Sequence, residues 1–130
     1  MKNFVSLRIA ALALIAAFIV NATCVDASVN FLGVAAGDAT TADVTVWTRA
    51  KDESNPQPTA TNVQISTDPR FNSGVTTLPA GTADASTDYT VKTNVGSLES
   101  GTVYYYRFQT TDGLIISNVG KVKTAPGPDS

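Results

Sequence analysis

The amino-acid sequence predicts an all-β protein, built as an antiparallel β-sandwich of about seven strands. Thr, Val, Ser, Gly and Asp are abundant in residues 28–130, a composition that favours strands separated by turns. No window of this region shows the 3.6-residue periodicity of an amphipathic helix. Short segments of alternating polar and apolar residues are instead divided by turn signals about 8–12 residues apart, which is the spacing of a sandwich.

The first four strands are expected at residues 29–35, 42–48, 62–67 and 75–78. In the second of these, Val44 and Val46 share one face and Trp47 lies on the other, because successive side chains of a strand point to opposite faces. Residues 52–58 form a charged loop broken by prolines, which cannot donate to a β-ladder. Pro79 is expected to close the fourth segment, which we interpret as an edge strand.

The last three strands are expected at residues 89–95, 102–110 and 114–124. The segment 102–110 shows the strongest alternation, with Tyr104, Tyr106 and Phe108 on one face. The pair at 112–113 is an Asp-Gly hairpin signal that returns the chain into the last strand. Seven short strands in this order are typical of an immunoglobulin-like or fibronectin type III-like sandwich.

Residues 1–27 are expected to be a signal peptide. A basic start precedes residues 9–20, which contain no polar side chain. Such a helix covers only about 18 Å, whereas a membrane span needs about 20 apolar residues, so a signal peptide fits better than the alternative of an uncleaved anchor. Val25 and Ala27 supply small residues at the two positions that a signal peptidase reads. We expect cleavage after Ala27 and a mature chain that begins at Ser28 and is secreted, or periplasmic in a bacterium.

The residue inventory excludes several kinds of chemistry. Cleavage after residue 27 removes Cys24, the only cysteine, so the mature chain would hold itself together without a disulfide. No histidine is present, which removes the commonest acid–base group and nitrogen ligand. The full chain has nine basic and eleven acidic residues. Cleavage would remove Lys2, Arg8 and Asp26, which leaves a mature charge of about −3 and no basic stripe. We expect no cofactor, no metal, no nucleic-acid partner and no membrane span in the mature chain.

Six segments, in order, resemble one family. Residues 31–38 resemble the opening strand of the N-terminal domain of PhoD-type alkaline phosphatases, with Ala36 in place of the usual Ser and Ala39 where a Pro is typical. Residues 44–49 (VTVWTR) resemble the Trp-containing strand of that domain. The similarity continues through residues 63–71 (VQISTDPRF), 87–91 (TDYTV), 98–108 (LESGTVYYYRF) and 119–126 (VGKVKTAP), and covers nearly all of residues 30–126.

This resemblance implies an immunoglobulin-like or fibronectin type III-like domain at residues 28–125, followed by a linker-like tail at residues 126–130. In that family the domain precedes a large metallophosphoesterase domain, which carries the metals and the catalytic groups. No segment of the 130 residues resembles that second domain. We therefore expect no residue of this chain to be catalytic, and the implied partner is a metallophosphoesterase catalytic domain.

Three residues are expected to have a structural role at one corner of the sandwich. Leu98, Gly101 and Tyr104 have the spacing of the E–F corner, where the tyrosine buries its ring and its hydroxyl bonds to nearby backbone. On the opposite face of the same strand, Tyr105 and Arg107 form either a binding patch or an ordinary solvated surface.

Trp47 is expected to pack between the two sheets. The alternative is exposure at a domain interface, because Val44, Val46 and Thr48 occupy the opposite face of the same segment. The pattern alone does not decide which of the two faces points inward.

One segment is a candidate contact with another domain. It consists of Gly33, Val34, Ala35, Ala36, Gly37 and Asp38. Small residues let another backbone approach closely, although the segment is equally well read as a plain strand and turn. The aspartates 84, 88 and 112 follow no calcium-loop spacing, and no serine lies in a Gly-x-Ser-x-Gly elbow.

Two functional hypotheses follow from these observations, and a third is disfavoured. The first is a non-catalytic accessory domain that packs against or presents a phosphatase domain. The second is a detached, secreted binding module for a surface ligand or carbohydrate. A small independent enzyme is disfavoured by the residue inventory. The first two hypotheses differ in whether the genomic sequence just downstream encodes a metallophosphoesterase.

Overall fold

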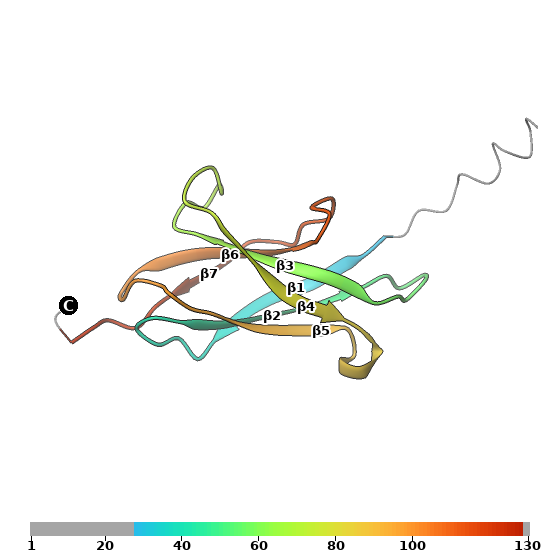
Figure 1. The fold of residues 1–130 in the computed structure, drawn as a ribbon, viewed down its shortest axis with the longest axis horizontal. Coiled ribbons are helices and arrows are strands. Elements are labelled where there is room, and N and C mark those ends of the chain that lie inside the picture. Colours follow the sequence, from blue (N-terminus) through green and yellow to red (C-terminus); the bar gives the residue numbers. More distant parts are fainter. Residues whose placement is uncertain (1–27, 129–130) are drawn as a thin grey trace, which may run out of the picture.

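The computed structural model describes residues 28–128, and within them seven strands form two antiparallel sheets packed face to face (Figure 1). The three-stranded sheet has the order β1 (Asn30–Gly37), β2 (Val44–Lys51), β5 (Thr90–Val95). The four-stranded sheet has the order β4 (Thr76–Ala83), β3 (Thr59–Ser66), β6 (Val103–Thr110), β7 (Gly120–Lys123). A single 3-10 turn, η1 (Ala85–Thr87), lies between β4 and β5 in this part of the chain. The predicted all-β sandwich of about seven strands is confirmed.

The core fills the space between the sheets with alternate residues of each strand. In β2 the fully buried Val44 and Val46 point inward, and in β6 Tyr106 and Phe108 do the same. Burying a side chain of this size stabilises the fold by roughly 1.5–3 kcal/mol. The buried apolar set consists of Val44, Val46, Ala50, Val63, Ile65, Ala80, Ala83, Val91, Val95, Tyr106 and Phe108.

The prediction that Trp47 packs between the sheets is wrong. Trp47 is 37% exposed and lies on the outer face of the three-stranded sheet. Its neighbours in β2, Val46 and Thr48, are both buried, so the alternation of the strand turns the indole outward. Of the two arrangements that the sequence left open, the structure adopts the one with an exposed tryptophan.

Two strands at the edges of the sheets differ from their predicted lengths. β4 does not end at Pro79 but runs on to Ala83, because a proline is tolerated on an edge strand. Its pairing with β3 shifts register between Thr61 and Asn62. The predicted strand at 114–124 is wrong in its first half, since β7 begins only at Gly120.

Residues 114–119 form a loop that joins the edge of β6 through side-chain as well as backbone hydrogen bonds. In the backbone, the Thr110 N–H donates to the Ile115 carbonyl at 3.0 Å and the Ser117 N–H donates to the Phe108 carbonyl at 2.8 Å. The Ser117 hydroxyl accepts the Phe108 N–H at 2.8 Å, and the Thr110 hydroxyl accepts the Ile115 N–H at 3.2 Å. Only one isolated bridge, between Gln109 and Ile116, remains of the expected pairing in this described loop.

The two described ends of the chain lie at opposite ends of the sandwich (Figure 1). Ser28 enters beside the β2–β3 loop, where its N–H donates to Asp52. At the other end, the Ala125 N–H donates to the Thr40 carbonyl at 2.9 Å, and the Gly101 N–H donates to the Ala125 carbonyl at 2.9 Å. The exit of the chain is therefore tied to the β1–β2 and β5–β6 loops.

The predicted signal peptide, residues 1–27, and the last two residues of the predicted tail lie outside the described residues. Among residues 28–128 no helix has the length and hydrophobicity that a transmembrane span requires.

Candidate docking surface

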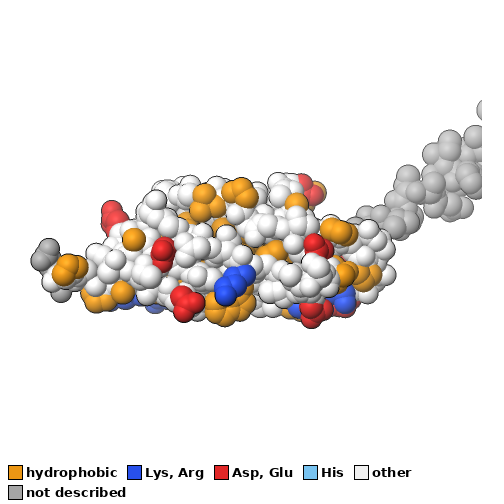
Figure 2. All heavy atoms as spheres, turned by 60° about the horizontal axis from the view of Figure 1, so that its bottom comes forward, with side chains coloured by type: hydrophobic (Ala, Val, Ile, Leu, Met, Phe, Trp, Pro, Cys, Tyr) orange, Lys and Arg blue, Asp and Glu red, His pale blue; other side chains and the backbone are white. Residues whose placement is uncertain are grey.

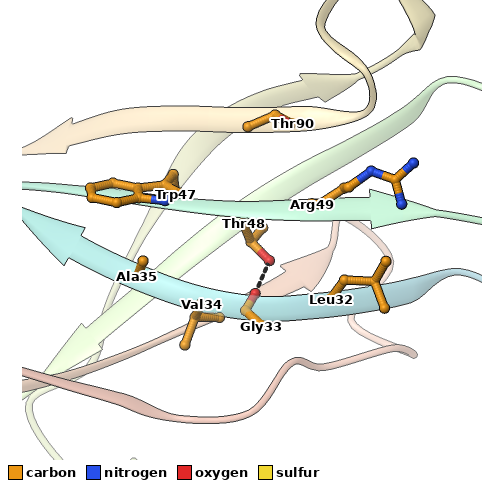
Figure 3. Close-up of a pocket in the computed structure, with 8 residues that line it drawn as sticks. All are labelled: Leu32, Gly33, Val34, Ala35, Trp47, Thr48, Arg49 and Thr90. Carbon is orange, nitrogen blue, oxygen red and sulfur yellow. Dashed lines mark hydrogen bonds between the residues drawn. The ribbon is translucent and has the colours of Figure 1, made fainter.

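The outer face of the three-stranded sheet carries a shallow pocket beside Trp47 (Figure 3). The pocket has a volume of about 290 Å³, and Figure 3 shows Trp47 at one end with Leu32 and Arg49 at the other. We refer to it as the Trp47 pocket; its lining residues are Leu32, Gly33, Val34, Ala35, Trp47, Thr48, Arg49 and Thr90. In Figure 2, which brings the lower side of Figure 1 forward, apolar side chains reach the surface between acidic and basic ones.

A bulge in β1 shapes the floor of this pocket. The register of β1 against β2 shifts between Phe31 and Val34, and Gly33 takes a φ of +72°, a left-handed conformation that favours glycine. The buried Thr48 hydroxyl donates to the Gly33 carbonyl, which holds the bulge against β2 (Figure 3). Leu32, beside the bulge, is 54% exposed.

The segment singled out in the sequence lies mostly on the edge strand β1. Gly33, Val34 and Ala35 line the Trp47 pocket, and Gly37 lies under the indole. Ala36 packs against the core instead. Asp38, exposed and left-handed with a φ of +51°, begins the β1–β2 loop and is not part of the pocket.

Four pocket residues were not singled out as contact residues from the sequence: Leu32, Thr48, Arg49 and Thr90. Leu32 and Arg49 lie on β1 and β2. The sequence does not show which face of these strands points outward until the orientation of Trp47 is known. Thr90 comes from β5, and the pairing of β5 with β2 is a long-range contact that no local pattern indicates.

The charge of Arg49 at the rim of the pocket is balanced by two carboxylates. Its Nη2 lies 3.2 Å from Asp88 Oδ1, and its Nη1 lies 3.2 Å from Glu53 Oε1. The hydrogen bond to Asp88 and that to Glu53 raise the pKa of Arg49 above its ordinary value. Lys51 also contacts Glu53, at 3.3 Å. The charge of Arg49 is thus compensated within the described surface.

The corner residues occupy the end of the sandwich where the chain exits. The Tyr104 ring is partly buried against the core, and its hydroxyl accepts the Glu99 N–H at 2.9 Å. Leu98 also packs against the core, and its N–H donates to the Ala42 carbonyl at 2.9 Å. Gly101 takes a φ of +59°. These contacts are the backbone interactions expected of residues at such a corner.

The acidic side chains considered for calcium serve local turns. Asp84 caps η1 by accepting the Ser86 N–H, Asp88 pairs with Arg49, and Asp112 accepts the Thr110 hydroxyl at 2.6 Å. Within residues 28–128 no group of three or more His, Cys, Asp or Glu side chains is placed to hold a metal ion.

Comparison with known proteins identifies the chain over most of its length. Residues 21–126 match the family model described as PhoD-like phosphatase, N-terminal domain. Alkaline phosphatase D of Bacillus subtilis (strain 168) is 36% identical over 121 residues, which cover 88% of this chain and 20% of that protein. The chain thus spans about a fifth of the length of the curated relative that it matches.

Solved structures agree with this assignment and with the fold. A structure of PhoD superposes with a TM-score of 0.62 at 33% identity, covering 75% of this chain and 19% of that one. A fibronectin type III domain from the human KIAA0970 protein superposes with a TM-score of 0.51 at 16% identity, covering 78% of this chain and 77% of that one. The second likeness shows the fold alone.

Proposed function

Because this chain belongs to the family of PhoD-like phosphatase N-terminal domains, we propose that it is a non-catalytic accessory domain that packs against a phosphatase catalytic domain. The observation that carries the proposal is the position of Trp47, the only tryptophan of the chain, on an outer sheet face. Large aromatic side chains are enriched at the centres of protein interfaces, where they bury much surface with few rotatable bonds.

The surroundings of Trp47 support a docking role. The Trp47 pocket is lined on the β1 side by small or aliphatic residues, and its one charged residue, Arg49, is paired with carboxylates. A partner side chain entering the pocket would therefore replace water at little electrostatic cost.

The exit of the chain lies close to one end of this surface. The Thr40 carbonyl, three residues after Gly37, accepts the Ala125 N–H at 2.9 Å. The family is named for an N-terminal position, so in its members the remaining phosphatase sequence follows this domain. Because the end of the described chain is tied to the β1–β2 loop, a domain that follows it would lie beside β1. A catalytic domain on a separate chain would use the same surface, the Trp47 pocket.

The chemistry of the available donor groups supports the absence of catalysis. Phosphate-ester hydrolysis in metal-dependent enzymes requires converging carboxylates, imidazoles or thiolates that hold the ions. The chain has no histidine, and Asp84 and Asp112 are engaged singly in a cap and a turn, while Asp88 pairs with Arg49. Chain 28–130 should therefore not hydrolyse p-nitrophenyl phosphate or a phosphodiester analogue with calcium, iron, zinc or no added metal. Turnover that co-purifies with the chain through repeated chromatography would disprove this part of the proposal.

Docking can be tested by calorimetric titration of chain 28–130 into the catalytic part of Bacillus subtilis alkaline phosphatase D, with retained phosphatase activity as the folding control. The wild-type chain should bind. Trp47→Ser should weaken the complex about 30-fold or more, since truncation of a central aromatic anchor typically costs about 2 kcal/mol or more. Tyr105→Ser, on the outer face of the other sheet, should not. No binding by the wild type, or equal loss in both variants, would contradict the proposed surface.

A further inference from the structure

We propose that Asp52 is the acceptor site for a processed N-terminus: once the chain is cleaved after Ala27, the α-ammonium group of Ser28 forms an ion pair with the Asp52 carboxylate. The inference is independent of the docking partner. It rests on the buried carboxylate of Asp52 and on its contact with the Ser28 nitrogen, the atom that the predicted cleavage would free.

Asp52 is an unusual carboxylate for this chain because it is only 4% exposed. It follows β2 directly and organises the start of the β2–β3 loop. Its Oδ1 accepts the Ser54 N–H at 3.0 Å, the Ser54 hydroxyl at 2.7 Å and the Asn55 N–H at 3.2 Å. These local contacts account for one oxygen of the carboxylate.

The second oxygen, Oδ2, accepts a hydrogen bond from the main-chain nitrogen of Ser28 at 2.9 Å. The hydrogen bonds from the Ser54 hydroxyl and from the Ser28 and Asn55 N–H groups hold the pKa of Asp52 below its ordinary value, so the group is ionised at neutral pH.

No cation balances this charge in the described part of the chain, where all three ion pairs involve Arg49 or Lys51 instead. Lys51 and Glu53, the charged neighbours of Asp52 in sequence, contact each other at 3.3 Å. A buried carboxylate without a cation is costly, and a positive group at hydrogen-bond distance stabilises it.

Signal peptidase cleavage would supply that cation at the same atom. Hydrolysis adds water across the bond between the Ala27 carbonyl carbon and the Ser28 nitrogen; Ala27 keeps the new carboxylate, and the nitrogen leaves as an amine that takes up a proton. An α-amino group has an ordinary pKa of about 7.7–8.0, so it is largely protonated at neutral pH. A carboxylate at this distance favours the protonated form further.

The pair would fasten β1 to the end of β2. Ser28 lies two residues before Asn30, whose register partner in β2 is Lys51. Asp52 follows Lys51 directly, so the ion pair closes the open end of the β1–β2 ladder. Processing would thereby strengthen the edge strand that lines the Trp47 pocket.

The test compares three forms of the chain: a free amine at Ser28, an acetylated Ser28, and a form that retains Ala27 as its first residue. Thermal unfolding is followed at neutral pH. The free Ser28 amine should raise the melting temperature by about 4–8 °C over the other two forms, the shift that one favourable interaction of ordinary strength produces in a domain of this size.

The same comparison in Asp52→Asn should show no difference between the forms, because the carboxamide carries no charge. Glu53→Gln is the matched control, in which the advantage of the free amine should persist. Equal melting temperatures for the three wild-type forms, or an advantage that survives in Asp52→Asn, would overturn the proposal. If Asp52→Asn does not fold, the acetylated and free forms of the wild type still decide the question. Mass spectrometry of the secreted chain should show Ser28 as the first residue, and any other start also overturns it.

Discussion

The Trp47 indole lies across the backbone of Gly37. A Cβ atom at Gly37 would stand 3.2 Å from Cη2 and 3.3 Å from Cζ3 of the indole ring, closer than ordinary van der Waals contact. Glycine at this point of β1 therefore lets the ring approach the backbone closely. The pairing of Ala35 with Trp47 across the strands places a second small residue beside it.

Gly37→Ala should leave the fold intact while moving the indole outward by a few tenths of an ångström. The φ of Gly37 is not in the left-handed region, so alanine brings no backbone strain and restricts the unfolded chain. Trp47 is the only tryptophan, and quenching of its fluorescence by acrylamide should increase. Gly96→Ala, where an added Cβ meets nothing within 4 Å, should leave quenching unchanged. Identical quenching in wild type and Gly37→Ala would show that the ring is not held by this contact.

Trp47→Ala should destabilise the chain much less than a core truncation of similar size. Phe108 is fully buried, and its replacement by alanine should cost about 3–5 kcal/mol. Trp47 lies on an outer face and loses only part of its contacts, so its truncation should stay below about 2 kcal/mol. Urea unfolding of the two variants measures both values. A loss for Trp47→Ala equal to that for Phe108→Ala would contradict the outward placement.

The alternation of polar and apolar residues was sufficient to predict the fold, because each inner strand has one buried face. It was not sufficient to place Trp47, since both faces of residues 44–48 carry apolar side chains. Only the packing of Val44 and Val46 against the four-stranded sheet decides which face points inward. Residues 114–119, which were predicted to belong to the last strand, have the apolar composition of a strand. They form a loop in which the Ser117 and Thr110 hydroxyls accept two N–H groups that a regular ladder would pair with carbonyls. The pocket itself depends on long-range neighbours such as Thr90, which a local pattern does not reveal.

Tyr104→Phe should lower the free energy of unfolding by about 1 kcal/mol. The change keeps the ring but removes the oxygen that accepts the Glu99 N–H, and an ordinary hydrogen bond contributes about 0.5–1.5 kcal/mol. Tyr105→Phe is the matched control, because its hydroxyl bonds to no residue between 28 and 128. Denaturant unfolding of both variants is the measurement. If the two lose the same stability, the corner contact contributes nothing specific.

Gly120→Ala should destabilise the chain by about 1–3 kcal/mol or more. An added Cβ would overlap the Tyr106 ring, which is only 2% exposed and has no room to move aside. Gly96→Ala again serves as the control for a glycine replacement in open space. Thermal unfolding should separate the two variants by several degrees. A Gly120→Ala chain that melts like the wild type would show that β7 shifts freely.

Stability should be nearly constant between about pH 5 and 7 and should fall below about pH 4. The chain has no histidine to titrate in the first range. In the folded state the Ser54, Ser86 and Thr110 hydroxyls, together with nearby N–H groups, lower the pKa of Asp52, Asp84 and Asp112 respectively. The unfolded chain then binds more protons in acid, so protonation favours unfolding as the pH drops. Urea midpoints at pH 7, 5 and 3 give the profile, and a marked loss between pH 7 and 5 would disagree with it.

The placement of the two described ends has a mechanical consequence. Ser28 enters at one end of the sandwich and Ala125 leaves at the other, so tension between them runs along the strands. Antiparallel hydrogen bonds lie perpendicular to the strands, and such a pull therefore shears the β1–β2 and β6–β7 ladders as units instead of opening them one bond at a time. A pull applied at the two ends would therefore load the Ser28–Asp52 contact at the entry, and the contacts of Ala125 with Thr40 and Gly101 at the exit, together with these ladders.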